Sequence, residues 1–161
     1  MFTASPNVPG VVALPSAPRV AGVRRELFAS DGWRLLTGPE RSWQIELSGA
    51  DRHPSEIWTE IEQTISLLAK ADRVRPLVID MRGRPRLEPA TRWAMAPLLA
   101  RYESAEVRVA LISEVDLVQL ARVHSLLGHH APTRGRRCLS MAEALGWVRP
   151  VPPLLVPLSA A

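Results

Sequence analysis

Two kinds of hydrophobic periodicity alternate along the chain and predict an order of strands and helices. Apolar residues alternate with polar ones over residues 42–48, and this segment together with residues 33–37 predicts a β-hairpin. From about residue 54 to residue 71 the apolar spacing changes to three and four residues, which predicts an amphipathic helix. The positions with this spacing are Trp58, Ile61, Ile65 and Leu68.

Short apolar runs alternate with further helical patterns in the second half of the chain. The runs at 76–81 and 107–112 predict buried strands, and a weaker run at 136–140 predicts an edge strand. Helices are predicted at 89–102, 115–127 and 141–148. Pro97 removes a backbone donor from the first of these, which predicts a kink or a break. The order predicts an α/β fold with a mixed sheet of about five strands and about four helices.

The composition is that of one globular domain with different material at its ends. The chain has 161 residues, of which 47% are hydrophobic and 22% are charged. Eight of the fifteen prolines lie near the termini. We therefore expect Pro-rich tails at residues 1–24 and 150–161, and a folded domain at residues 25–149.

The basic charge of the chain is weak evidence for a nucleic-acid partner. The formal charge is +4, but Lys70 is the only lysine among twenty basic residues, so a general bias toward arginine explains the excess. The arginine clusters at 82–86 and 134–137 lack the interleaved aromatic residues that stack on bases. These features disfavour nucleic-acid binding.

The absence of targeting and redox signals predicts a cytoplasmic protein. Cys138 is the only cysteine, so an intramolecular disulfide and a cysteine metal cluster are excluded. Prolines interrupt the apolar residues near the N-terminus, where a signal peptide needs an unbroken run. No apolar run approaches the roughly 18 residues that a membrane span requires.

The sequence contains no pattern that is typical of an enzyme or of a bound cofactor. We find no phosphate-binding glycine loop, no dinucleotide fingerprint and no nucleophile paired with a base. The adjacent His129 and His130 would point about 100° apart on a helix, so they form no two-ligand face. We therefore expect a non-catalytic protein without a metal or cofactor.

Four stretches of the chain, which together span about residues 42–148, resemble a STAS domain, the fold of the bacterial anti-sigma factor antagonists. The resemblance rests on the order of elements, on Leu47-Ser48-Gly49 at the end of a strand, and on the Asp80-x-x-Gly83 turn. The closing residues Ala142 to Trp147 resemble the end of the related SpoIIAA-like proteins. The stretches are SWQIELSGADRHPSEIWTEIEQTI, RPLVIDMRGRPRLEPATRWAMAPLLARY, EVRVALISEVDLVQLARVHSLLGHH and RRCLSMAEAL.

The resemblance implies a bacterial regulatory module that binds a protein partner: an anti-sigma factor, a kinase or a scaffold. A homodimer is also left open. Antagonists of this family carry Asp-Ser-Ser-Gly or Asp-Ser-Thr-Gly where a kinase phosphorylates the first hydroxyl group. Here the corresponding residues are Glu88, Pro89, Ala90 and Thr91, so proline stands at the acceptor position. The usual switch is not expected to operate there, and the Thr91 side chain is expected to point elsewhere around the helix.

The predicted binding site lies where the central strand meets the following helix. Ligands of open α/β sheets bind at the carboxyl ends of parallel strands, often against helix N-termini. The candidate residues for binding a partner or an anion are Asp80, Arg82, Gly83, Arg84, Arg86, Glu88 and Thr91. The alternative is that Asp80 braces the loop while the arginines are solvated.

A second functional hypothesis is a SpoIIAA-like carrier or sensor of a small apolar or anionic ligand. An apolar cavity lined by Trp58, Trp93 or Trp147, with a volume above roughly 300 Å³, would favour it. Core packing is the first interpretation of the five tryptophans, but one or two are candidates for exposed anchors of a protein interface.

Overall fold

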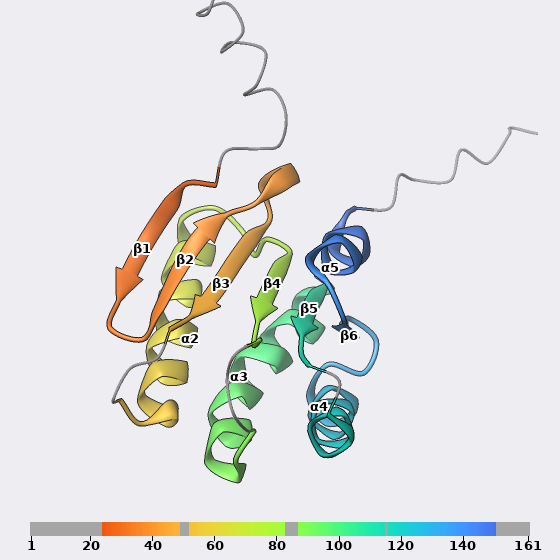
Figure 1. Ribbon diagram of the computed structural model, residues 1–161. Helices are drawn as coiled ribbons and strands as arrows, with labels where there is room; N and C mark the ends of the chain where they lie inside the picture. Colours follow the sequence, from red (N-terminus) through yellow and green to blue (C-terminus); the bar gives the residue numbers. More distant parts are fainter. Residues whose placement is uncertain (1–23, 49–51, 83–86, 115, 151–161) are drawn as a thin grey trace, which may run out of the picture.

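The computed structural model of the protein describes residues 24–48, 52–82, 87–114 and 116–150. Strands and helices alternate after an initial group of three strands (Figure 1). In chain order, the elements are β1 (Glu26–Ser30), β2 (Trp33–Thr37), the 3-10 turn η2 (Pro39–Arg41), β3 (Trp43–Leu47), α2 (Pro54–Ala71), β4 (Leu77–Asp80), α3 (Pro89–Ala105), β5 (Val109–Ile112), α4 (Leu117–His130), β6 (Gly135–Cys138) and α5 (Met141–Val148).

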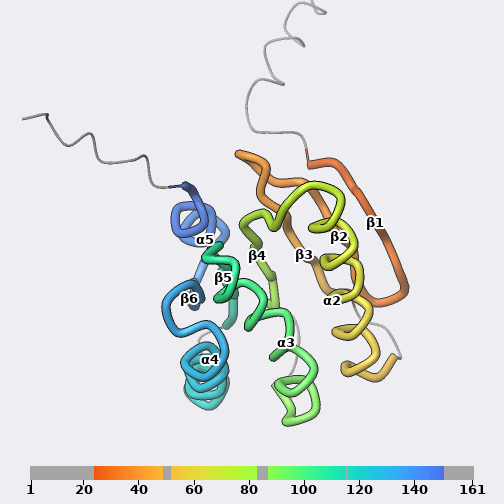
Figure 2. The backbone as a smooth tube through the Cα atoms, turned by 180° about the vertical axis from the view of Figure 1, so that it is seen from behind, coloured from red at the N-terminus to blue at the C-terminus, as the bar shows by residue number. Residues whose placement is uncertain are grey.

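The six strands form one mixed sheet whose spatial order is the same as their order in the sequence. The strands β1, β2 and β3 pair antiparallel, and β3 to β6 pair parallel. Right-handed crossovers that always advance in one direction place their helices on one face. Accordingly, α2, α3 and α4 cover one face of the sheet and α5 packs on the other (Figures 1 and 2). The predicted fold class is confirmed, with six strands where about five were expected.

The strand β1 was not predicted from the sequence. Its residues are mostly exposed and show no alternation, because it is an edge strand with an irregular register between Glu26 and Phe28. The signal that could have found it is the pair Asp31-Gly32, since a two-residue Asp-Gly turn is typical of a tight hairpin. Gly32 has a φ of 99°, in the region that only glycine enters readily.

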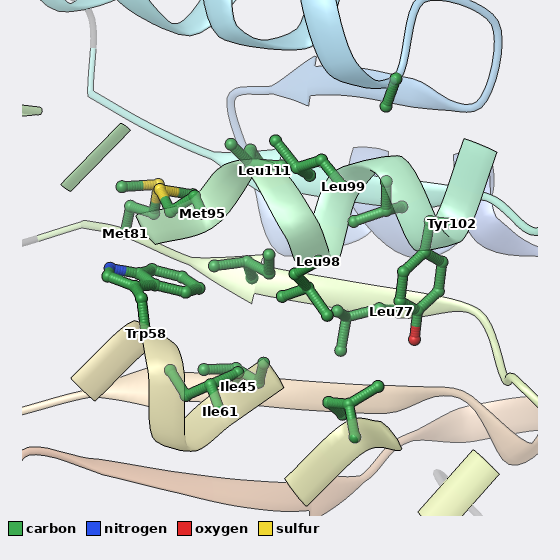
Figure 3. Packing of buried hydrophobic residues seen from close by; sticks show 14 of the residues in the cluster. Ile45, Trp58, Ile61, Leu77, Met81, Met95, Leu98, Leu99, Tyr102 and Leu111 are labelled. Carbon is green, nitrogen blue, oxygen red and sulfur yellow. The ribbon is translucent and has the colours of Figure 1, made fainter. Parts of the chain in front are cut away.

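The main core lies between the sheet and the three helices α2, α3 and α4. Ile45, Ile79 and Leu111 are in register on three neighbouring strands and are fully buried. Figure 3 shows Trp58 of α2 and Leu98 of α3 packing onto this layer. The predicted buried strands at β4 and β5 and the predicted amphipathic face of α2 are thus confirmed.

The opposite face has a smaller core under α5. Val78, Ala110, Ile112 and Cys138 contact Ala144 and Val148 of this helix. The helix begins with a capping arrangement, because the Ser140 Oγ accepts the backbone N–H of Glu143 at 3.2 Å. Gln44 is also buried, and both polar atoms of its side chain lack a hydrogen-bond partner within the described part of the chain.

Pro97 does not divide the helix in which it lies. The helix α3 runs without interruption from Pro89 to Ala105, so the predicted break does not occur. Burial of Met95, Leu98 and Leu99 holds this segment against the sheet on both sides of the proline. Tertiary packing of this kind outweighs the loss of one backbone hydrogen bond.

None of the helices in the described ranges is both long enough and apolar enough to cross a membrane.

Candidate functional site

At the carboxyl end of β4, an internal ion pair occupies part of the predicted site. The Asp80 carboxylate accepts hydrogen bonds from the backbone N–H of Arg82 at 3.1 Å and from its guanidinium at 2.9 and 2.7 Å. Burial disfavours the charged form of Asp80, but the bonds from Arg82 outweigh it and lower the pKa of this carboxyl group. Asp80 thus braces the loop, whereas Arg82 is paired with it and is not simply solvated.

The helix start that follows the loop presents little reactive chemistry. Glu88 is exposed and precedes α3, where its side chain makes no capping hydrogen bond. Thr91 is only 5% exposed, so its side chain is largely covered by the fold. The hydrogen bonds and ion pairs among described residues connect Asp80 to Arg82 and connect neither of them to Glu88 or Thr91. Gly83, Arg84 and Arg86 lie outside the described residues.

A groove lies beside this helix start, between α3 and α4. The backbone N–H of Leu87 donates to the Gln119 side chain at 3.1 Å, which ties the segment before α3 to α4. The groove has a volume of about 240 Å³. Its lining residues come from the first turns of α3 and the last turns of α4: Pro89, Arg92, Trp93, Ser125, Leu126, His129 and His130.

Trp93 is the unusual residue of this groove because it is 81% exposed. Trp33, Trp43 and Trp58 are buried, and Trp147 is half-buried. Core packing, the first interpretation from the sequence, is therefore wrong for Trp93. The signal that could have placed it is the helical period of α3, since Met95, Leu98, Leu99 and Tyr102 face the sheet and Trp93 falls about 200° around the helix from Thr91.

The lining of the groove suits recognition better than catalysis. Trp93, Pro89 and Leu126 provide apolar surface, and Arg92 provides a positive charge. Ser125 and His129 also meet there, but His129 Nδ1 lies 2.7 Å from the carbonyl oxygen of Ser125. That ring nitrogen is thus engaged with the helix backbone and does not activate the serine hydroxyl group.

A second cleft, of about 580 Å³, lies at the opposite, amino-terminal end of the parallel strands. Its lining contains arginines and no tryptophan. The apolar cavity that would favour a carrier was expected beside Trp58, Trp93 or Trp147. Trp58 is buried in the core, and the groove beside Trp93 has a volume of about 240 Å³, which is below the roughly 300 Å³ expected of a ligand cavity.

Comparisons with protein-family models, with curated proteins and with solved structures find no match to this chain.

Proposed function

We propose that this protein is a non-catalytic regulatory module that binds another protein through the groove between α3 and α4. The observation that carries the proposal is the exposure of Trp93, a large aromatic side chain that stands in a groove instead of in the core. Tryptophan is the residue type most enriched among the side chains that dominate protein interfaces.

The lining of the groove defines the chemistry of the partner. An apolar side chain would fill the space between Trp93 and Leu126, and a carboxylate beside it would pair with Arg92, which forms no ion pair within the described ranges. Hydrogen bonds between two charged groups are stronger than those between neutral groups. The partner segment is therefore apolar with an adjacent acidic residue.

The resemblance to anti-sigma factor antagonists narrows the class of partner to an anti-sigma factor, a kinase or a scaffold. Two observations support a module that is not switched by phosphorylation at the usual position. Pro89 stands at the acceptor position, and Thr91 is buried, whereas a kinase needs an exposed acceptor. Control would then act through the abundance of the partner or through another site.

Capture of proteins from a lysate of the source organism tests the proposal. Trp93→Ala is compared with Leu67→Ala, which removes another exposed apolar side chain from α2, a helix that does not line the groove. We expect a protein that wild type and Leu67→Ala retain and that Trp93→Ala loses. Capture of the same proteins by all three chains, or of none by the wild type, contradicts the proposal. Mass spectrometry of the protein purified from its host adds a check, because phosphate on Thr91 contradicts the unswitched mechanism.

A further inference from the structure

An arginine precedes each of the four parallel strands by one or two residues. Arg41 comes two residues before β3, and Arg75 two residues before β4. Arg108 and Arg134 directly precede β5 and β6. The spacing between these arginines in the sequence is irregular, so only the strand positions reveal the pattern.

The sheet topology turns this pattern into a row. The strands β3, β4, β5 and β6 are neighbours in that order, and their first residues are in register. The carbonyl oxygens of Pro76, Arg108 and Arg134 each accept a hydrogen bond from the backbone N–H of the first residue of the preceding strand, at 2.8 to 3.2 Å. These bonds fix the backbone at the amino-terminal end of the strands. Neighbouring strands lie about 4.8 Å apart, so the row spans roughly 14 Å. In Figure 1 the amino-terminal ends of β3 and β4 are their upper ends.

The row lines the cleft of about 580 Å³ at the amino-terminal end of the sheet. Six arginines contribute to this lining, against two carboxylates, Glu40 and Glu106. The volume is within the range of small-molecule sites, about 300 to 1,000 Å³. The six arginines are Arg41, Arg73, Arg75, Arg108, Arg134 and Arg149.

Two of the six arginines are engaged in ion pairs within the fold. Arg149 pairs with Glu40 at 3.1 Å, and Arg75 pairs with Asp72 at 2.5 Å. The other four arginines of the lining form no ion pair with any residue in the described ranges.

The side chain of Arg108 is held in place by Trp147 in the absence of a ligand. Its guanidinium lies over the Trp147 ring, 4.3 Å from the ring centroid, and donates to the Trp147 carbonyl at 3.0 Å. A cation that is already ordered loses less conformational entropy when it binds an anion.

We propose that this cleft binds a small polyanion that carries two or more phosphate groups. Each arginine of the lining can donate two parallel hydrogen bonds to a phosphate group, so several of them in one cleft can bind more than one such group. The cleft suits a small molecule better than a nucleic acid. The ring of Trp147, the nearby aromatic residue, is covered by the guanidinium of Arg108 and by that of Arg136, which lies 5.3 Å from the ring centroid. No open aromatic face within the lining is left for bases to stack on. The site lies at the end of the sheet opposite the start of α3 and does not depend on the protein partner proposed above.

Calorimetric titration of the full chain with inorganic tripolyphosphate, at fixed ionic strength, tests this site. Arg134→Ala and Arg73→Ala remove one lining charge each, and their side chains make no described hydrogen bond whose loss would unfold the protein. Arg122→Ala on α4 is the matched control for net charge, since Arg122 does not line the cleft. We expect each lining variant to weaken binding about tenfold, because a hydrogen bond to a charged group is lost. The control should bind as the wild type does.

Three results would overturn the proposal. They are no heat of binding for the wild type at millimolar tripolyphosphate, equal weakening by Arg122→Ala, and an affinity for inorganic monophosphate that equals the affinity for tripolyphosphate. A single-stranded oligonucleotide that binds more tightly than tripolyphosphate and is weakened by the same variants would show a nucleic-acid site instead. Trp93→Ala, which leaves the cleft intact, should not change the tripolyphosphate affinity.

Discussion

The two ends of the parallel sheet differ in how their described arginines are paired. At the carboxyl end, Arg82 is bonded to Asp80 within its own loop, and the nearest surface feature is the groove of Trp93. At the amino end, Arg73 and Arg134 line a cleft without forming an ion pair among the described residues. An arginine from a local cluster in the sequence is thus paired within its own loop, whereas arginines that are far apart in the sequence are brought together along one cleft.

The largest effect should separate the two ends by their ligands. Trp93→Ala should lower the affinity for the protein partner by about 30-fold or more, equivalent to about 2 kcal/mol, as for other central interface tryptophans. Arg134→Ala should leave that affinity unchanged. Surface plasmon resonance with the captured partner measures both. If Arg134→Ala weakens partner binding as much as Trp93→Ala does, the two ends form one interface and the comparison fails.

A second test concerns the support beneath the amino end. Tyr102 is fully buried in the core and donates its hydroxyl group to the Arg75 carbonyl at 2.7 Å. Burial raises its pKa, so the hydroxyl group remains a donor across the accessible pH range. Tyr102→Phe should lower the free energy of unfolding by about 1 to 2 kcal/mol, because the buried carbonyl loses its partner. Urea denaturation measures this change, and an unchanged midpoint and slope would show that the contact contributes nothing.

Particular residues show how far the sequence predicted this molecule. The periodicity of α2 and the apolar runs of β4 and β5 were sufficient to predict the fold class, because the spacing of apolar side chains shows which face of an element is buried. Trp93 was misplaced because hydrophobic character alone does not say which side of a helix faces the core. The arginine row could not be predicted at all, since it requires the strand order and register.

The third prediction concerns the buried amide near the start of β3. Gln44 is 1% exposed, and neither polar atom of its side chain has a partner among the described residues. Gln44→Met retains the shape and removes the unpaired groups, so it should raise the free energy of unfolding by about 1 kcal/mol. Gln63→Met, at an exposed position of α2, is the control and should have no effect. Destabilisation by Gln44→Met would show that the amide is bonded in solution.

The smallest effect is expected at the carboxyl end. The pKa of Asp80 is lowered in the folded protein, so its stabilisation is present above the unfolded pKa and is lost as the pH falls through the folded pKa. Asp80→Asn should cost less than about 1 kcal/mol at pH 7, as is usual for partly exposed ion pairs. The difference from wild type should shrink in acid. Chemical denaturation across pH 3 to 7 measures it, and a difference that grows in acid would contradict the assigned role.

Photo-cross-linking from position 93 tests the central claim most directly, because it reports contact with the partner and not only affinity. Trp93 is replaced by the photoreactive p-benzoylphenylalanine, and the same replacement at Leu67 on α2 serves as the control. We predict that irradiation in the lysate joins position 93 to a single protein species and leaves position 67 without that product. Identical cross-linked products from both positions, or none from position 93, would contradict a partner-binding groove between α3 and α4.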